Sequence, residues 1–348
     1  MRCLKLIRVL AAICLLMVAS LPCLAWDPDG HQIVAAIAYD QLNPKAKTAA
    51  QELAKEVVGP GVTYDPVTIA CWMDDLRDKT TNIPYHGLFF PWHYVDFGLS
   101  PTDPRPFTEP GEDNETSGNV VTALKRAMVV LQGGTDPYIK TKAMAFAIVT
   151  HLVGDIHQPL HAAAYYYRQS DGRWANDAGG NKVAIVNGPA IEPKYNLHYF
   201  WDAAWRAGFD VKSGLVVVDL QYENWNHHNP QVILPLAKEL EASYKPIPSE
   251  NLEPDFVGWA NESNQIAREV IYPRLMFTEG HRSARIGAEY AALANPLARR
   301  RLALAGYRLA TLLNETLGAA TPPAVPASYP AGPPRVVPDA TQTVPPKT

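Results

Sequence analysis

The chain has 348 residues, with 35 acidic against 31 basic side chains and a formal net charge of −4. That sign excludes a protein that holds duplex DNA by a broad basic surface. The length allows one large domain or two small ones, with a sizeable core.

The first 25 residues are predicted to be a secretory signal peptide. A basic start precedes the apolar stretch 9–18, and Cys23 and Ala25 offer small residues at the cleavage positions. The stretch is too short to cross a bilayer comfortably, and no later segment resembles a membrane helix. Lipid attachment at Cys23 is the alternative, which Pro22 disfavours. We therefore expect a secreted or periplasmic protein without stable membrane association. It would begin at Trp26 and carry a net charge of about −7, because the signal removes three basic residues and no acidic ones.

The apolar periodicity downstream predicts a mainly helical protein. Apolar residues three and four apart predict helices, in chain order, at 30–42, 45–58, 119–131, 139–153, 197–206, 231–244, 256–271 and 296–317. A strand-like segment at 182–186 with an Asn187-Gly188 turn predicts a small β-hairpin. Long loops are expected over 98–116 and 168–195, where function often resides. We therefore predict an all-α fold in a single domain over residues 26–318, followed by a Pro- and Ala-rich disordered tail over 319–348.

One cysteine remains once the signal is removed. Cys71 has no partner, so we expect no intramolecular disulfide. Structural zinc could supply cross-links instead. Because Cys71 lies beside Trp72 among apolar residues, we interpret it as a buried small hydrophobe rather than as a zinc ligand or a nucleophile.

The segment HLVGDIHQPLH, from His151 to His161, is rich in metal-binding side chains. His151 and Asp155 lie four residues apart, so on a helix they share a face and can point at one metal ion. Pro159 ends or kinks the helix and turns His161 toward a different centre. His157, two residues past Asp155, should face away from that metal. On this segment alone, a buried helix with hydrogen-bonded histidines stays an equal alternative.

The same spacing recurs downstream in NLHYFWDAAW, where His198 and Asp202 stand four residues apart. Further candidate ligands are His93 in PWHYVDF, Asp74 in CWMDDLR and His31 near the mature start. Together these residues supply enough nitrogen and oxygen ligands for more than one metal ion. Packing alone does not explain such a set.

Several motifs, in this order, resemble those of the S1/P1 nuclease family, which are secreted phosphodiesterases with three zinc ions. They are the mature amino-terminal Trp26 with His31 five residues on, WxD in CWMDDLR, HYVD, GDIHQPLH, AGGN at 178–181, NLHxxWD, and AGYRLA at 305–310. GDIHQPLH and NLHxxWD are the most specific, and the resemblance covers most of the mature chain. It implies the mainly helical fold that these nucleases share with zinc phospholipase C. The chain departs from the family at Asp27-Pro28-Asp29, which replaces a glycine that often follows the first tryptophan.

The resemblance implies a ligand set for each of three Zn²⁺ ions. The first set is Asp74, His93, His151 and Asp155. The second set is His161, His198 and Asp202. The third set is the free amine and carbonyl of Trp26, together with His31 and with Asp155, which bridges to the first ion. That amine exists only if the signal is cleaved directly before Trp26.

The resemblance also implies the reaction. A hydroxide shared by the first and third zinc ions attacks phosphorus in line with the departing 3′ oxygen, whose charge the second zinc ion neutralises. Arg77 stabilises the crowded phosphate. Tyr94 offers a face for base stacking, and Asp96 accepts hydrogen bonds from a base edge. The expected substrates are single-stranded DNA and RNA, cleaved endonucleolytically to 5′-phosphorylated products, with 3′-nucleotidase activity as a further expectation. The simpler alternatives are an exposed ion pair for Arg77 and core packing for Tyr94.

Two other functions stay open. Zinc-dependent phospholipase C resembles these nucleases in fold and in its tryptophan-led zinc triad, but a lipid headgroup has no use for the base-stacking face of HYVD. A non-catalytic zinc-binding protein would need neither a bridging carboxylate nor Arg77. Every expected ligand comes from one chain, so a monomer suffices.

Overall fold

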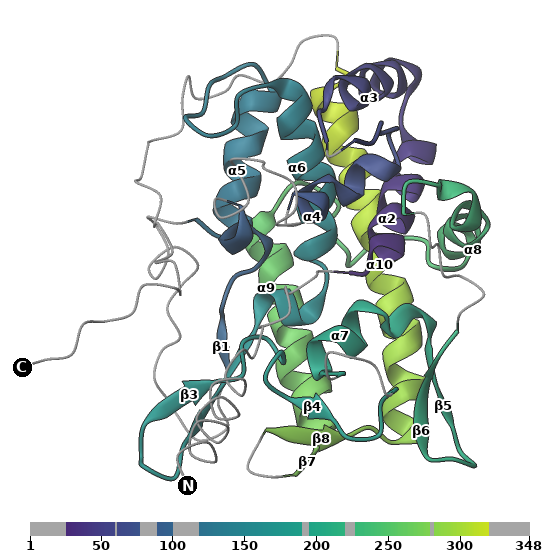
Figure 1. The fold of residues 1–348 in the computed structure, drawn as a ribbon. Coiled ribbons are helices and arrows are strands. Elements are labelled where there is room, and N and C mark those ends of the chain that lie inside the picture. Colours follow the sequence, from purple (N-terminus) through teal and green to yellow (C-terminus); the bar gives the residue numbers. More distant parts are fainter. Residues whose placement is uncertain are drawn as a thin grey trace, which may run out of the picture.

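The computed structural model describes residues 26–59, 61–76, 89–99, 118–189, 195–219, 227–278 and 282–319. The predicted signal peptide, the predicted tail beyond residue 319, most of the predicted loop at 98–116, and Arg77 lie outside these ranges. The described chain is mainly helical, as predicted (Figure 1). Within these ranges, no helix combines the length and the apolar character needed to cross a membrane.

Each helix predicted from apolar spacing has a counterpart in the structure. The α-helices are α2 (Pro28–Gln41), α3 (Pro44–Glu56), α4 (Trp72–Asp75), α5 (Val120–Leu131), α6 (Lys142–Asp155), α7 (Leu197–Asp202), α8 (Leu234–Ser243), α9 (Phe256–Ile266) and α10 (Ala288–Thr316). Short 3₁₀ turns are η1 (Thr68–Cys71), η2 (Phe90–His93), η3 (Pro159–Ala162), η4 (Ala204–Arg206), η6 (Pro230–Val232) and η8 (Tyr272–Arg274). A π-helical turn, η7 (Ala267–Ile271), continues α9.

The last helix begins earlier than predicted. α10 starts at Ala288, so Pro296 lies inside the helix rather than at its first turn. Proline favours a first turn because it lacks the N–H group, which is why its position suggested a helix start. The preceding segment, AEYAALA, consists mostly of strong helix formers, and its propensity outweighs the one hydrogen bond that Pro296 removes.

Three small sheets lie at one end of the helical body. β2 (Ala164–Arg168) pairs in parallel with β1 (Gly98–Leu99) and antiparallel with β3 (Trp174–Asn176). β8 (Ser283–Arg285) pairs in parallel with β4 (Ala184–Ile185) and antiparallel with β7 (Met276–Thr278). β5 (Ala207–Asp210) and β6 (Leu215–Val218) form a separate hairpin. The predicted loop at 168–195 therefore contains strands.

The strand predicted at 182–186 is present as β4, which pairs with β8 on one edge and forms an antiparallel bridge from Ala184 to Asn196 on the other. The Asn187-Gly188 pair does not form a two-residue hairpin turn, because the Asn187 side chain is buried and joins other segments. Its amide donates to the carbonyls of Gly214 (3.0 Å) and Ile286 (2.7 Å), and its oxygen accepts from the Ile286 N–H. The hairpins lie instead at β2–β3, β5–β6 and β7–β8.

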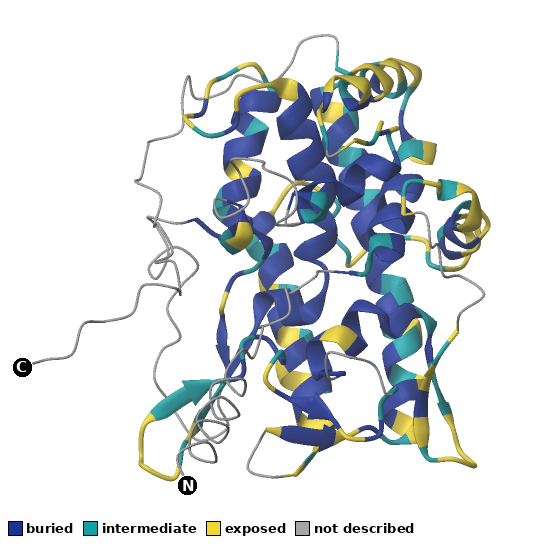
Figure 2. Cartoon of the chain, in the orientation of Figure 1, coloured by how far each residue is buried: buried dark blue, intermediate teal, exposed yellow. Residues whose placement is uncertain are grey.

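The core surrounds α6, which is buried along almost its whole length, and the segment 29–38 of α2, which is also buried (Figure 2). α2 packs along α10, and α5 packs along α6. The sequence of α6, KAMAFAIVTHLVGD, is apolar on every side, as a helix enclosed by other helices requires. Polar residues on α6 therefore lie inside the protein, where each needs a partner.

Candidate metal centre

Helix α6 carries two predicted ligands into the interior at its carboxyl end. The hydroxyl of Thr141 fixes the start of the helix by accepting a hydrogen bond from the backbone N–H of Met144. All of the helix except Lys142 is buried, and His151 and Asp155 have 0% exposure. The helical spacing places these two side chains one turn apart on the same face, as predicted.

The chain turns sharply after α6 and presents His161. Oε1 of Gln158 accepts a hydrogen bond from the Leu160 N–H at 2.6 Å, and Pro159 begins η3. The side-chain Nε2 of Gln158 donates to Oδ1 of Asp202 at 2.7 Å. Gln158 therefore connects the segment that carries His161 to a carboxylate on α7.

One group of side chains surrounds Asp155. We call it the Asp155 cluster, and it consists of His31, Asp74, His93, His151 and Asp155. Oδ2 of Asp155 lies 3.0 Å from Nδ1 of His93 and 3.3 Å from Nε2 of His151. Oδ1 of Asp155 lies 3.3 Å from Nε2 of His31. A carboxylate oxygen of Asp74 lies within 4.8 Å of ring nitrogens of His31 and His151. The two oxygens of Asp155 thus face different histidines.

Trp26 lies against the same cluster. Its indole Nε1 donates to the Gly154 carbonyl at 2.9 Å, and the ring of His31 stacks on that of His151 with a centroid distance of 4.0 Å. A Cβ on Gly154 would lie 2.9 Å from Nδ1 of His31. Glycine is therefore required where α6 passes the His31 ring.

The second group, which we call the Asp202 cluster, consists of His161, His198 and Asp202. The side chain of Asn196 caps α7 by accepting from the Tyr199 N–H. Nε2 of His198 lies 3.7 Å from Oδ1 of Asp202 and 2.9 Å from Nε2 of His161. All three ligand side chains are buried.

The tautomers of the Asp202 cluster fit a bound cation. Nδ1 of His161 donates to the His93 carbonyl at 2.7 Å, and Nδ1 of His198 donates to the Gly179 carbonyl at 2.6 Å. A carbonyl oxygen only accepts, so each neutral ring turns an unprotonated Nε2 toward the other. Two lone pairs 2.9 Å apart repel unless a cation lies between them. Two nitrogens bound tetrahedrally to one Zn²⁺ lie about 3.3 Å apart, so these rings need only a small shift.

The hydrogen bonds of the Asp155 cluster also fit a bound cation. Nδ1 of His151 donates to the Ala70 carbonyl at 2.6 Å, which leaves its Nε2 facing His93 and Asp155. Within the described residues, neither ring nitrogen of the fully buried His31 makes a hydrogen bond. A buried imidazole in that state is expected where a metal ion completes its bonding.

The charges in the Asp155 cluster also favour a cation. Burial lowers the pKa of His151, but the carboxylates of Asp155 and Asp74 outweigh this and raise it to about 9. Burial and the neighbouring charges of His151 and His161 hold the pKa of His31 well below its usual value. His151 is thus protonated at neutral pH, while His31, which stacks on it, stays neutral. The carboxylates of the cluster therefore carry more negative charge than its own residues neutralise.

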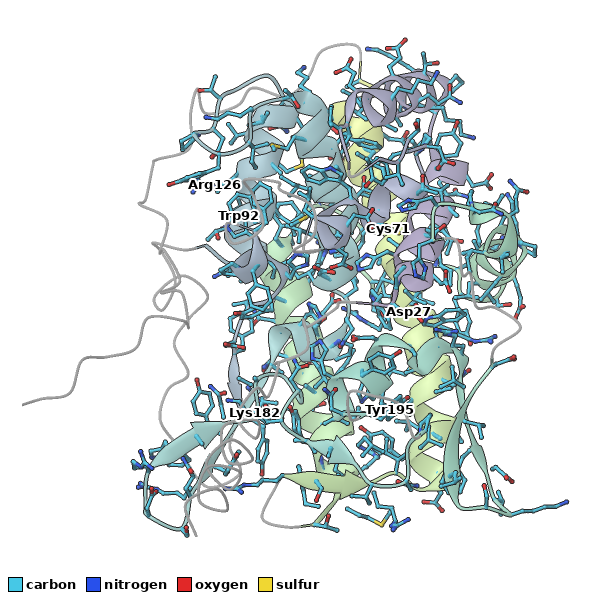
Figure 3. The ribbon with its side chains drawn as sticks, viewed as in Figure 1. Asp27, Cys71, Trp92, Arg126, Lys182 and Tyr195 are labelled. Carbon is cyan, nitrogen blue, oxygen red and sulfur yellow. The ribbon has the colours of Figure 1, made fainter. Side chains whose placement is uncertain are left out.

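Asp27 fixes the position of Trp26. Its side chain caps α2 by accepting from the Gly30 N–H, and Oδ1 also accepts from the indole of Trp205 at 3.0 Å (Figure 3). The guanidinium of Arg206 pairs with Oδ2 at 2.9 Å. The backbone N–H of Asp27 donates to the Asp202 carbonyl. Trp26 is therefore held between the two clusters by its neighbour.

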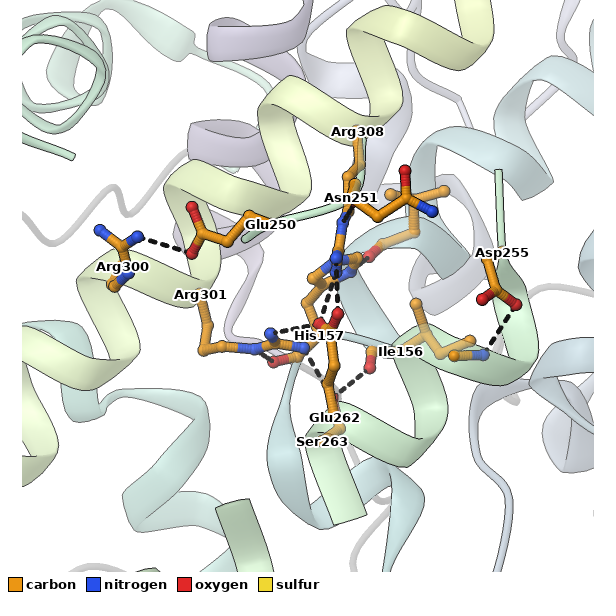
Figure 4. Close-up of polar contacts among 12 residues, drawn as sticks. Ile156, His157, Glu250, Asn251, Asp255, Glu262, Ser263, Arg300, Arg301 and Arg308 are labelled. Carbon is orange, nitrogen blue, oxygen red and sulfur yellow. Dashed lines mark hydrogen bonds and ion pairs between the residues drawn. The ribbon is translucent and has the colours of Figure 1, made fainter. Parts of the chain in front are cut away.

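A buried ionic network lies behind the turn that follows Asp155 (Figure 4). Arg308 on α10 pairs with both oxygens of Glu262 at 2.7 Å and contacts Nε2 of His157 at 2.9 Å. Arg301 pairs with Glu262 at 3.0 Å and donates to the His157 carbonyl. Burial and the two arginines keep the pKa of His157 well below its usual value. His157 thus faces α10 rather than the clusters, as predicted.

The remaining predicted site residues differ in how far they are buried, and one lies outside the described residues. Tyr94 follows η2 and is half-buried, with its ring edge-to-face with Phe90 at 6.2 Å, and Asp96 is exposed. Arg77 lies outside the described residues. Cys71 is buried and its pKa is raised well above the usual value by burial and by nearby aspartates, so it stays a neutral thiol, as predicted.

Sequence reasoning missed the residues that support the ligands. Gln158 and Gly154 lie inside the GDIHQPLH segment, which offered a signal, and Asp27 has the residue type of a helix N-cap before a proline. Glu262 and Arg206 offered none, because their partners are distant in the sequence.

Comparison with known proteins identifies the family. The S1/P1 Nuclease family model matches residues 26–318. Endonuclease 2 of Arabidopsis thaliana is 25% identical over 306 residues, which cover 84% of this chain and 91% of that protein. Nuclease S1 of Aspergillus oryzae is 24% identical over 178 residues (51% of this chain, 53% of that protein). Nuclease P1 of Penicillium citrinum is 26% identical over 183 residues (51% and 57%). The chain therefore belongs to the S1/P1 nuclease family, whose members are hydrolases of phosphodiester bonds.

Proposed function

We propose that the mature protein begins at Trp26 and is a secreted zinc-dependent endonuclease that hydrolyses single-stranded DNA and RNA to 5′-phosphorylated products. The observation that carries the proposal is the position of Asp155, whose two oxygens face different histidines. A carboxylate with this arrangement can serve two metal ions at once, which hydrolytic sites use and storage of single ions does not require.

Three ions would be held by the two clusters and the mature amino terminus. The proposed first set is Asp74, His93, His151 and Asp155. The proposed second set is His161, His198 and Asp202. The proposed third set is the amine and carbonyl of Trp26, with His31 and Asp155. When bound, zinc supplies Lewis acidity, which activates water and neutralises charge on a phosphate.

The protein's own residues position these groups. The carbonyls of Ala70, His93 and Gly179 hold three imidazoles with Nε2 turned inward. Gln158 orients the carboxylate of Asp202 through a 2.7 Å hydrogen bond. We assign Arg77, three residues after Asp74 in the sequence, to the phosphate, because a guanidinium binds phosphate oxygens in a bidentate manner.

Recognition of the base is assigned to Tyr94 and Asp96. The Tyr94 ring is half-buried, and the exposed Asp96 can accept hydrogen bonds from an exocyclic amine. Stacking on an aromatic ring contributes about 1–3 kcal/mol per base and accepts any base, but the base must be unstacked from its neighbours. This favours single strands over duplex. The same site would accept a 3′-nucleotide, since that substrate presents one base and one phosphate.

Secretion, signal cleavage before Trp26 and a monomeric state belong to the same proposal. The amine ligand requires cleavage at that position. The clusters draw all of their residues from one chain, so activity needs no second subunit.

The test is cleavage of heat-denatured DNA, RNA and duplex DNA by protein that begins at Trp26, with and without a zinc chelator. We expect chelator-sensitive release of acid-soluble products from the single strands. Each product should carry a phosphate at its 5′ end. Phosphatidylcholine serves as the control substrate.

Lipid hydrolysis with intact nucleic acid would assign the site to a phospholipase C instead. Products with 3′ phosphate, or cleavage that persists in the chelator, would contradict the proposed chemistry.

A further inference from the structure

The β2–β3 hairpin carries aromatic and basic side chains on one face. Tyr166 pairs with Asn176 across the hairpin, and Arg168 pairs with Trp174. Directly opposed residues, and residues two apart along a strand, point to the same face. These four residues therefore form one surface, which we call the hairpin face. The guanidinium of Arg168 lies 4.5 Å from the centroid of the Trp174 ring, which confirms that the two share it.

The opposite face of the hairpin anchors it to the body. Tyr165 is buried and stacks on Tyr272 at 4.8 Å with an interplanar angle of 20°. Tyr167 packs against the core. The carboxylate of the buried Asp177 accepts hydrogen bonds from the Tyr165 N–H and from the Tyr272 hydroxyl. The half-buried Tyr166 and Trp174 and the exposed Arg168 lie on the other face.

The charge on and beside the hairpin face is positive. Within the described residues, Arg168 and Lys182 form no ion pair with a carboxylate. Arg168 donates to the Gly172 carbonyl, and Lys182 donates to the Asn176 carbonyl at 3.2 Å (Figure 3). Arg173 at the hairpin tip is instead paired with Asp171. The hairpin face therefore combines aromatic rings with a cation, and a second cation, Lys182, is bonded to its edge.

The hairpin is joined to both clusters by short, bonded segments. β2 begins three residues after His161, whose carbonyl accepts from the Val95 N–H at 2.8 Å. Val95 lies between Tyr94 and Asp96, so the segment assigned to base recognition runs beside the base of the hairpin. Beyond β3, the Gly179 carbonyl accepts from His198. The two ends of the hairpin are thus bonded to segments that carry residues of the candidate metal centre.

We propose that the hairpin face, with Lys182, binds the part of a single-stranded nucleic acid that extends beyond the cleaved phosphodiester. Trp174 and Tyr166 would stack on unpaired bases, and Arg168 and Lys182 would contact phosphates. This inference rests on the proposed nuclease function and adds a subsite to it. Aromatic rings that alternate with cations favour single strands, because the rings need unstacked bases and the cations need a polyanion.

The test compares a long substrate with a short one. KM and kcat are measured on a single-stranded oligonucleotide of about 20 nucleotides and on a dinucleotide, for wild type, Trp174→Ala, Trp174→Phe and Arg168→Glu. Lys212→Glu is the matched control, because Lys212 is an exposed cation at the tip of the other hairpin, β5–β6. Thermal unfolding checks that each variant folds.

On the long substrate, Trp174→Ala is expected to raise KM about fivefold or more, the loss for one stacked base. Trp174→Phe is expected to restore most of that loss. Arg168→Glu is expected to raise KM and to flatten the dependence of log(kcat/KM) on log[salt] by about 0.7 or more, because one phosphate contact is lost. All variants should cleave the dinucleotide as wild type does, and Lys212→Glu should match wild type on both substrates.

Unchanged KM on the long substrate, or equal losses on both substrates, would overturn the subsite. Fluorescence anisotropy of the labelled oligonucleotide with the same proteins separates the two proposals. If wild type cleaves neither substrate, the nuclease proposal fails. The hairpin proposal then survives only if wild type binds the oligonucleotide and Trp174→Ala and Arg168→Glu bind it at least about fivefold more weakly.

Discussion

Asp155 determines the charge balance of the candidate metal centre. It lies at 0% exposure and is within 3.3 Å of His31, His93 and His151. A buried carboxylate needs cationic partners to offset its charge, and among these three histidines the pKa of His151 is raised to about 9. Each of its oxygens faces a different part of the cluster, so no other side chain can replace both contacts.

Asp155→Asn tests this role. The amide keeps the shape of the side chain but removes the charge and places an N–H₂ group against imidazole nitrogens. We expect fewer zinc ions per chain and a fall in kcat of at least about a thousandfold, since metal-ion catalysis contributes several kcal/mol. Asp210→Asn, at an exposed turn residue, is the control for the chemical change and should leave both unchanged. Normal zinc content and activity in Asp155→Asn would contradict the assignment.

Gly154→Ala tests the close approach of α6 to His31. The added methyl group would lie 2.9 Å from Nδ1 and 3.2 Å from Cε1 of His31, so the ring must shift. We expect a loss of about 1–3 kcal/mol in the free energy of unfolding and weaker zinc binding at the position next to Trp26. Gly208→Ala is the matched control, because its Cβ would meet only Val217 Cγ2, at 3.4 Å. Equal behaviour of the two variants in calorimetry and zinc titration would argue against a constrained His31.

The sequence predicted the candidate metal ligands better than the residues that support them. The spacing of His151 and Asp155, and of His198 and Asp202, follows from helix geometry, so their pairing was predictable. Asp74 and His93 required the family resemblance, because nothing local places them beside α6. Supporting contacts such as that of Glu262 with Arg308 join residues 46 apart, and no local pattern reports such pairs.

At the scale of elements, α9 and α10 fix the turn that joins the two clusters. Arg301 donates to the His157 carbonyl and to the Ser263 hydroxyl, and Ser263 donates to the Ile156 carbonyl (Figure 4). Backbone groups directly after Asp155 are thus bonded to both helices. Glu262 pairs with both arginines on which this arrangement depends.

Glu262→Gln tests the network. Removing one partner of a fully buried ion pair costs about 3–5 kcal/mol, and we expect about 2 kcal/mol here because the Glu262 side chain is 39% exposed. The readout is the free energy of unfolding in urea. Glu239→Gln is the control, since its pair with Arg299 is exposed, and should change stability by less than about 0.5 kcal/mol.

The stability difference between wild type and Glu262→Gln should depend on pH. Burial raises the pKa of Glu262, but Arg308 and Arg301 outweigh it and hold the pKa below its usual value. The stabilisation is therefore present above the unfolded-state pKa of about 4.3 and is lost as pH falls through the folded-state pKa. The difference between wild type and Glu262→Gln should shrink below about pH 4. A difference that stays constant to pH 3 would contradict an ionic origin.

Helices were more predictable than strands. Apolar spacing in α2, α5 and α6 reports burial directly, and their bounds lie within a few residues of the prediction. β2 was missed because its sequence, AYYYR, has no alternation of apolar and polar residues: both faces carry tyrosine. The register that separates its two faces depends on β3 and on contacts with Tyr272, which are not encoded locally.

At the scale of the whole molecule, Trp26, the proposed mature amino terminus, is part of the candidate site. Trp26 is fully buried and bonded to Gly154, and Asp27 is bonded to the backbone of Asp202. Trp26 and Asp27 are therefore bonded to segments that are more than a hundred residues away in the sequence. Removal of the signal peptide is, in this proposal, a step of metal-site assembly.

Protein with one extra alanine before Trp26 tests that step. An amide nitrogen replaces the amine, so the third zinc should lose the amine ligand and the chelate that the amine forms with the Trp26 carbonyl, while the clusters keep their ligands. We expect about one zinc fewer per chain and a large fall in activity, measured by metal analysis and nuclease assay. The control is the same protein after the extra residue has been removed by an aminopeptidase, which should regain both. Full activity with the extension would exclude the amine as a ligand.

The most direct test of the central claim starts from protein that begins at Trp26 and has been stripped of metal by a chelator. Zinc is added in steps, and cleavage of single-stranded DNA is measured at each step. The proposal predicts that activity is absent without metal, returns with added zinc and saturates at three ions per chain. Saturation at one ion, or full occupancy without cleavage, would contradict a multi-zinc nuclease.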